Sequence, residues 1–160
     1  MTSSKGMMTA LRKLEYGVYV VTMGEKTEGN AFTASWISQV SSEPPMIILA
    51  INNKHQSSRI LQENGTFVVN FIPHDQVAVA KSYYGPAESG YQKLKNSTIQ
   101  DSPVTGTAML NGAAGFLECR VVKRIPAGNH TLLLSDVVAG EVAQDTAILT
   151  TSSSKLHYAG

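Results

Sequence analysis

Short apolar segments separated by polar turns run along the whole chain, and most have the length and composition of β-strands. Strands rich in Val, Ile, Thr and Tyr are predicted over 18–23, 30–40, 46–51, 66–72, 115–125 and 130–142. Short helices are predicted over 8–14, 57–63 and 76–84, with a helical turn near 92, a loop over 150–154 and a last short strand over 156–158.

Short helices inserted among six or so strands, without regular strand–helix alternation, favour a mainly β protein with an antiparallel barrel. No linker, repeat or low-complexity block divides the 160 residues, so we expect one domain, with residues 1–6 as a flexible leader. No apolar run approaches the ~18 residues of a membrane span, and the N-terminus lacks the apolar stretch of a signal peptide. The sequence therefore predicts a soluble, cytoplasmic protein that does not enter a membrane.

The charge balance excludes several classes of function. With 13 Lys and Arg against 12 Asp and Glu, the net charge is +1, so a nucleic-acid partner is not expected. A single cysteine excludes an internal disulfide and any thiolate-rich metal site. The four histidines, at 55, 74, 130 and 157, have no metal-ligand spacing, so no metal site is predicted. The low charged fraction of 16% favours a surface covered by a second subunit.

The segment 30–40 carries the first candidate chemistry. As one continuous strand it would place Phe32, Ala34, Trp36 and Val40 on one face, and Thr33, Ser35 and Gln39 on the other. One face is large and apolar, and the other is lined with small hydroxyl groups that can hydrogen-bond a ligand. An ordinary half-exposed strand would show the same pattern, so both interpretations stay open.

The turn that follows the buried strand 46–51 carries the second candidate chemistry. Its sequence is Asn52-Asn53-Lys54-His55-Gln56-Ser57-Ser58-Arg59, and no acidic residue occurs between Glu43 and Glu63. Two cations, a histidine and two hydroxyls beside a helix start would suit a phosphate dianion. A solvated loop with an ordinary serine cap is the alternative.

Several motifs together resemble the flavin reductase-like family. They are Leu11-Arg12-Lys13-Leu14-Glu15-Tyr16-Gly17-Val18-Tyr19-Val20-Val21-Thr22, Asn30-Ala31-Phe32-Thr33-Ala34-Ser35-Trp36, Gln39-Val40-Ser41-Ser42-Glu43-Pro44-Pro45, Leu117-Glu118-Cys119-Arg120-Val121-Val122, Ala127-Gly128-Asn129-His130-Thr131 and His157-Tyr158-Ala159-Gly160. The resemblance implies the FMN-binding split β-barrel, usually a homodimer. The tryptophan of Thr33-Ala34-Ser35-Trp36 is more similar to flavoredoxins and to the flavin reductase domains of diflavin proteins than to oxygenase-partner reductases.

The resemblance also implies a set of FMN-binding residues and one catalytic residue. Asn30, Thr33, Ala34, Ser35 and Trp36 would hold the isoalloxazine and ribityl parts, and Ser41 would add a polar contact. Asn52, Lys54, His55, Ser57, Ser58 and Arg59 would surround the phosphate, and Lys93 matches a family lysine. His130, the histidine of a Gly-Asp-His motif that here has Asn129 in the middle, would lie near the contact between nicotinamide and flavin.

Other residues have plainer expectations. Cys119 is predicted to be a small buried hydrophobe and His74 to be solvated. Tyr83 and Tyr84 fit either flavin contact or packing, and His157 and Tyr158 fit either the flavin edge or an anchor for the C-terminal segment.

Three functions remain open at this stage. The leading one is an FMN oxidoreductase that takes a hydride from NAD(P)H and passes electrons to a small-molecule or protein acceptor. The second is an FMN electron carrier reduced by a protein partner and indifferent to NAD(P)H. The third is a ligand-binding or structural barrel without redox chemistry.

Overall fold

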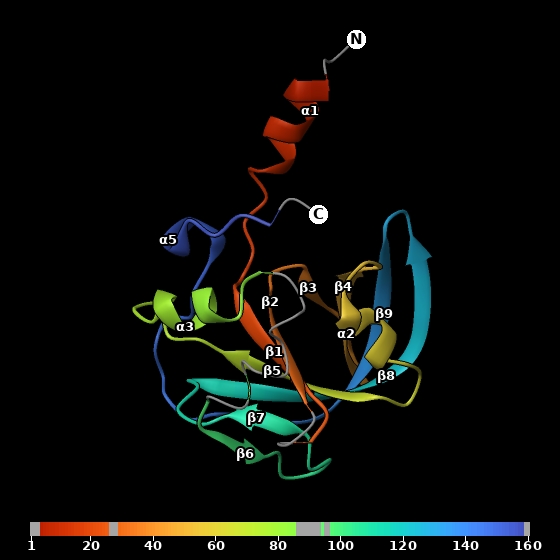
Figure 1. Ribbon diagram of the computed structural model, residues 1–160, viewed down its shortest axis with the longest axis vertical. Helices are drawn as coiled ribbons and strands as arrows, with labels where there is room; N and C mark the ends of the chain where they lie inside the picture. The colour runs from red at the N-terminus through yellow and green to blue at the C-terminus, as the bar shows by residue number, and fades with distance from the viewer. Residues whose placement is uncertain (1–3, 26–28, 86–93, 95–96, 159–160) are drawn as a thin grey trace.

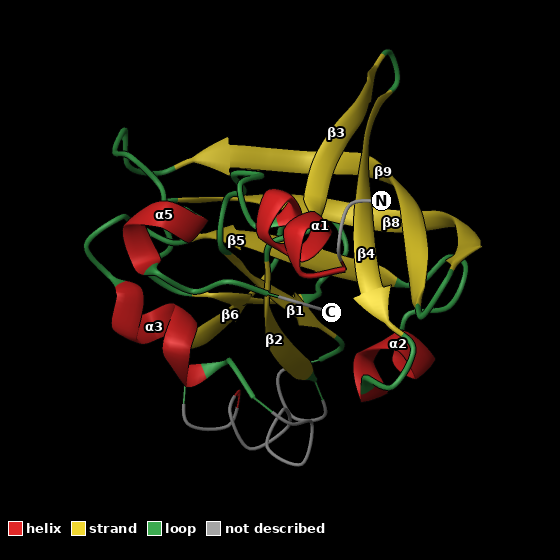
Figure 2. Ribbon diagram, turned by 90° about the horizontal axis from the view of Figure 1, so that it is seen from above, coloured by secondary structure: helices red, strands yellow, loops and turns green. Residues whose placement is uncertain are grey.

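The computed structural model describes residues 4–25, 29–85, 94 and 97–158. One antiparallel sheet of seven strands, in the order β2-β1-β5-β8-β9-β4-β3, curls into a barrel with its short helices on the outside (Figures 1 and 2). Its strands are β1 (Tyr19–Met23), β2 (Asn30–Ala34), β3 (Ile37–Ser42), β4 (Pro45–Asn52), β5 (Thr66–Phe71), β8 (Gly115–Ala127) and β9 (His130–Val142). The antiparallel architecture predicted from the sequence is confirmed.

Shorter elements complete the fold. The helices are α1 (Ser4–Leu11), α2 (Gln56–Ile60), α3 (Val77–Ser82) and α5 (Thr151–Ser154), and β6 (Ile99–Asp101) pairs with β7 (Ala108–Leu110) in a second sheet. Helix α1 begins at Ser4, inside the segment expected to be a leader. The expected loop over 150–154 is instead a helical turn, because Thr150 forms a capping box with Ser153. The expected strand over 156–158 is absent.

The barrel encloses one main hydrophobic core. Alternate residues of the strands point inward, as in Val21 and Met23 of β1 and Ile47, Leu49 and Ile51 of β4, all at most 4% exposed. A second cluster, around Val20, Ile72, Tyr83 and Leu149, joins α3 and the C-terminal part to the outer face of the sheet. The two clusters fix both sides of β1, so the elements that reach the candidate site rest on a rigid base.

The long strand predicted over 30–40 is two strands, and this expectation was wrong. The chain leaves the sheet at Ser35 and Trp36, where the Ile37 N–H donates to the Ser35 carbonyl (3.0 Å). Strand β2 pairs with β1, whereas β3 pairs with β4 at the opposite edge of the sheet. The predicted alternation therefore fails past the break, and Val40 is 52% exposed.

The two ends of the chain are tied together beside the barrel. The Thr151 N–H donates to the Tyr16 carbonyl (2.9 Å), and the Glu15 carboxylate accepts hydrogen bonds from Thr151 and Ser152. Helix α1 lies outside this junction, stands clear of the barrel in Figure 1 and has no buried residue.

Candidate functional site

The break between β2 and β3 lies beside the end of β4, and a pocket forms where they meet. The pocket is lined by Phe32, Thr33, Ala34, Ser35, Trp36, Ala50, Ile51, Asn52, His55 and Tyr158. The Ala50 N–H donates to the Trp36 carbonyl (3.0 Å), which fixes the break against β4. The fold thus brings together two segments that the sequence predicted separately, the hydroxyl-bearing strand and the turn after the buried strand.

Asn30 and Ser57 form a direct link between these two segments. The Asn30 side-chain amide donates to the Ser57 hydroxyl (2.9 Å), and its carbonyl oxygen accepts from the Ala31 N–H (2.8 Å). Both side chains are buried, at 5% and 2% exposed. The side of helix α2 that carries Ser57 therefore faces the barrel, and this hydrogen bond holds the helix against the start of β2.

The turn before α2 is fixed by asparagine side chains. The Asn52 side-chain oxygen accepts from the Lys54 N–H (3.0 Å), and the Thr131 hydroxyl donates to the Asn53 side-chain oxygen (2.7 Å). Because these bonds hold the turn, Lys54 projects into solvent while His55 is half-buried, with its ring 6.0 Å from that of Phe32. Arg59 is exposed on α2.

Arg124 is a member of this region that the sequence analysis missed. Its guanidinium donates to the Leu61 carbonyl and lies 3.5 Å from the Ser58 hydroxyl. Ser58 is 66 positions away in sequence, and no local motif signals the contact. Arg124 adds a third cation near the predicted phosphate residues and secures the end of α2.

Three aromatic rings meet at the pocket edge. The ring of Trp36 lies 4.9 Å from that of His130 and 4.8 Å from that of Tyr158, measured between centroids. The Nε2 atom of His130 is 2.9 Å from the Tyr158 hydroxyl, and its Nδ1 atom is 2.6 Å from the Asn129 side-chain oxygen. That oxygen only accepts hydrogen bonds, so Nδ1 carries the hydrogen and Nε2 accepts from Tyr158.

This arrangement keeps His130 neutral. Burial, and secondarily the charge of His55, holds the pKa of His130 below its ordinary value of 6.5. Burial likewise raises the pKa of the Tyr158 hydroxyl above 10.0, which keeps it a hydrogen-bond donor. The edge of the pocket is therefore formed by uncharged aromatic rings, and one hydrogen bond joins His130 to Tyr158.

Other predicted site residues have different surroundings. Ser41 pairs with Met46, six residues along β4 from Asn52 and so about 20 Å away, and the structure does not bring it to the pocket. Lys93 lies outside the described residues. Thr33 lines the pocket, but its hydroxyl donates to the Ala80 carbonyl (2.6 Å) of α3.

The residues outside the pocket confirm the plainer expectations. Cys119 is fully buried, and this burial, with the adjacent charge of Glu118, raises the pKa of its thiol to about 12. His74 is exposed. Tyr83 packs in the second hydrophobic cluster rather than lining the pocket.

The donor set suits a flavin that carries a phosphate. The pocket combines apolar walls with polar groups of Thr33, Ser35 and Asn52, as a ring with one apolar and one polar end requires. Lys54, Arg59 and Arg124 supply cations on the turn side, where a phosphate would be placed. In the described part of the chain, no three His, Cys, Asp or Glu side chains gather as a metal site.

Comparison with known proteins identifies the family. The model of the flavin reductase like domain matches residues 11–159. The chain belongs to the flavin reductase-like family. This confirms the resemblance seen in the motifs and the split-barrel fold that it implied.

Two sequence relatives and one solved structure illustrate the likeness. Diflavin flavoprotein A 1 of Synechocystis sp. is 25% identical over 84% of this chain, which spans only 24% of that protein. An NADH:FMN oxidoreductase of Rhodococcus erythropolis is 29% identical over 85% of this chain and 69% of its own length. The structure of an NADH:FAD oxidoreductase of Streptomyces globisporus C-1027 has a TM-score of 0.82 and 21% identity, covering 94% and 91% of the two chains.

No helix among the described residues is long and apolar enough to cross a membrane.

Proposed function

We propose that the protein is an FMN-binding oxidoreductase that takes a hydride from NAD(P)H and passes the electrons to an acceptor. The observation that carries this proposal is the convergence of the β2–β3 break, the Asn52–Arg59 turn and His130 on one pocket edge. The family membership and the Rhodococcus relative, named for reduction of FMN by NADH, support it.

The residues of the chain would bind and orient the cofactor. When bound, the flavin supplies the redox chemistry, accepting a hydride from reduced nicotinamide and holding the two electrons for an acceptor. Thr33, Ala34 and Ser35 would contact the polar end of the ring, and Trp36 would cover it by stacking. Lys54, Arg59 and Arg124 would hold the phosphate end, and the buried Ser57 and Ser58 would fix the start of α2 beneath it.

His130 would act at the reactive edge. Because Nδ1 is engaged by Asn129, a ligand would meet Nε2, the atom that now accepts a hydrogen bond from the Tyr158 hydroxyl. A neutral imidazole there can accept a hydrogen bond or a proton without placing a fixed positive charge beside the donor. We therefore assign His130 the role of positioning the nicotinamide; after taking a proton at Nε2 it would stabilise negative charge on the reduced cofactor.

A stopped-flow experiment tests this function. The purified protein is loaded with FMN under anaerobic conditions and mixed with NADH or NADPH, and the flavin absorbance band is followed. Rapid bleaching that saturates with donor concentration is the expected result. Protein that binds no FMN would refute the proposal.

The second candidate is an FMN electron carrier reduced by a protein partner. The tryptophan at position 36 and the likeness to a diflavin flavoprotein favour it. In this case FMN would bind with the same residues, but mixing with NADH or NADPH would leave the flavin oxidised. A chemically reduced sample would then pass its electrons to a partner protein.

We also propose that the protein is a cytoplasmic homodimer. Met7, Met8, Leu11 and Leu14 are exposed large hydrophobic residues on and just after α1, and a second subunit would cover them. Sedimentation equilibrium of the FMN-loaded protein measures this directly. A species of 17.2 kDa with FMN bound would exclude the dimer.

A further inference from the structure

The pocket that gathers the predicted flavin ligands has little free space. It encloses about 20 Å³, room for about one water molecule. Pockets for organic cofactors usually enclose about 300–1,000 Å³. A side chain of the pocket must therefore move before a tricyclic ring can enter.

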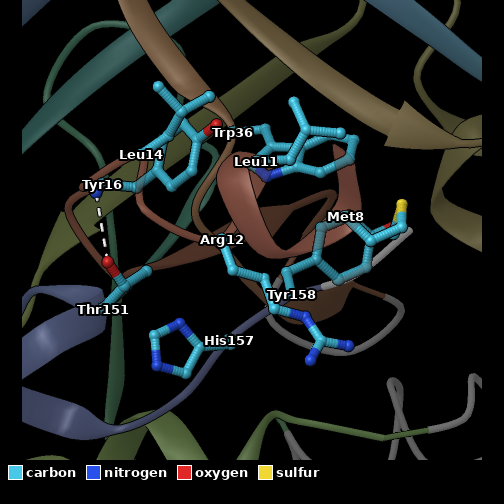
Figure 3. A pocket seen from close by; sticks show the side chains of 9 residues that line it. All are labelled: Met8, Leu11, Arg12, Leu14, Tyr16, Trp36, Thr151, His157 and Tyr158. Atoms are coloured by element: carbon cyan, nitrogen blue, oxygen red, sulfur yellow. Dashed lines mark hydrogen bonds between the residues drawn. The ribbon is translucent and has the colours of Figure 1, made fainter. Parts of the chain in front are cut away.

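A larger cavity lies directly beside this pocket. It encloses about 260 Å³ between α1 and the C-terminal segment (Figure 3), and Trp36 and Tyr158 line both this cavity and the smaller pocket. Displacement of either ring would join the two spaces into one groove that approaches the size of a cofactor pocket.

Of these two rings, Tyr158 is the one that can move. The backbone around Trp36 is held by hydrogen bonds of Ile37 and Ala50. Tyr158 lies instead on a segment without helix or strand, after the left-handed residue Lys155. Among the described residues, Tyr158 makes no backbone-to-backbone hydrogen bond.

The contacts that hold Tyr158 are made by residues assigned to the ligand. Its ring packs on Trp36 at 4.8 Å, and its hydroxyl donates to Nε2 of His130 at 2.9 Å. The side chain of Asn52 also hydrogen-bonds Tyr158. Tyr158 is thus an aromatic ring with one polar end that uses the surfaces a flavin ring would use.

We propose that Tyr158 is a displaceable occupant of the flavin site, and that the flavin ring must push it off Trp36 and His130 in order to bind. This inference rests on the proposed function. Its chemical consequence concerns His130, whose Nε2 atom exchanges the Tyr158 hydroxyl for the ligand. Binding of the cofactor and exposure of the reactive imidazole nitrogen are then one event.

Riboflavin binding to the apoprotein tests this competition. Trp36 is the only tryptophan in the sequence, so quenching of its emission reports occupancy of this site without any turnover. Tyr158→Ala should bind riboflavin about tenfold more tightly than the unmodified protein, the equivalent of about 1.4 kcal/mol. The gain for FMN should be the same, because Tyr158 occupies the space of the ring and both ligands carry the same ring. His74→Ala, which changes an exposed histidine that lines neither cavity, should bind as the unmodified protein does.

A second variant keeps the test decisive. Tyr158→Phe retains the ring but loses the hydroxyl, and should bind riboflavin about threefold more tightly. If the unmodified protein binds riboflavin and the Tyr158 variants bind it equally or more weakly, Tyr158 is a permanent wall of the site and the proposal is overturned. If neither the unmodified protein nor any variant binds riboflavin or FMN, the proposed function itself fails.

Discussion

The Asn30 amide donates a 2.9 Å hydrogen bond to the buried hydroxyl of Ser57, and this contact joins the first strand of the site to the helix of the phosphate side. The two residues are 27 positions apart, on segments that have no sheet pairing with each other. The contact therefore sets how far the ring side and the phosphate side of the site can separate.

A double-mutant cycle should show this coupling. Asn30→Ala should destabilise more than Ser57→Ala, because Asn30 also accepts from the Ala31 N–H. Each lost hydrogen bond costs about 0.5–1.5 kcal/mol. The double variant should lose about 1 kcal/mol less than the sum of the single variants, measured by urea unfolding. Asn30→Ala with Ser58→Ala is the control and should be nearly additive; additivity in the Asn30–Ser57 pair would contradict the coupling.

The phosphate side should distinguish FMN from riboflavin. Arg59→Ala should weaken FMN binding about tenfold, since a charge-assisted hydrogen bond is worth about 1.5–3 kcal/mol before the cost of ordering an exposed side chain. Riboflavin affinity should stay unchanged, because that ligand lacks the phosphate. Isothermal titration of both ligands measures the difference. Lys123→Ala removes an exposed cation on β8 and serves as the control, expected to leave both affinities unchanged. If the unmodified protein bound FMN and riboflavin with equal affinity, the assignment of the turn 52–59 to the phosphate would be wrong.

The titration of His130 should depend on the neighbouring His55. The pKa of His130 should lie below 6.5, because burial disfavours the imidazolium and a charged His55 repels it. His55→Ala should raise the pKa of His130 only part of the way, since burial remains. The C2–H resonance in an NMR titration follows this directly. Since the folded pKa is depressed, the stability contribution of His130 is complete above pH 6.5 and falls as the pH drops through 6.5 toward the folded pKa. A His130 pKa unchanged by His55→Ala would refute the coupling.

Glu118 should hold the loop before β7. Its buried carboxylate accepts hydrogen bonds from the backbone N–H groups of Val104 (3.1 Å) and Thr105 (2.9 Å) and from the Thr105 hydroxyl (2.8 Å). Burial alone would raise the pKa of Glu118, but these bonds hold it below 4.5. Glu118→Gln should therefore lower the free energy of unfolding by about 1–3 kcal/mol at neutral pH.

The pH dependence separates charge from packing at Glu118. The stabilisation is present above pH 4.5 and is lost as the pH falls through the lowered folded pKa, so the difference between Glu118→Gln and the unmodified protein should shrink in acid. Urea unfolding between pH 3 and pH 7 measures it. Glu141→Gln, an exposed change on β9, is the control. A difference that stays constant with pH would assign the effect to packing.

The sequence predicted the strands that have β-branched residues on a buried face, such as 66–72 and 130–142, within one residue of their bounds. It could not locate the break at Ser35 and Trp36, because the break depends on β2 and β3 pairing with different partners. It also missed β6 and β7, which are three residues each and too short for a periodic pattern.

Within the candidate site, local motifs predicted the residues that lie close in sequence. One pocket is lined by residues of the segment 30–36 and of the turn 52–59, the two segments that the sequence singled out as candidate ligand-binding features. Arg124 and Tyr158 were not predicted as partners of Ser58 and His130, because 66 and 28 positions separate the members of each pair. Such contacts depend on the closure of the barrel and leave no local signal.

The burial of Cys119 limits the redox reactions in which this chain can take part. Cys119 is fully buried, and this burial raises the pKa of its thiol to about 12, so we expect little thiolate at neutral pH and slow thiol–disulfide exchange. Changes in glutathione poise or mild peroxide would leave its sulfhydryl untouched. The proposed oxidoreductase would therefore keep its two-electron chemistry separate from the thiol pool of the cell.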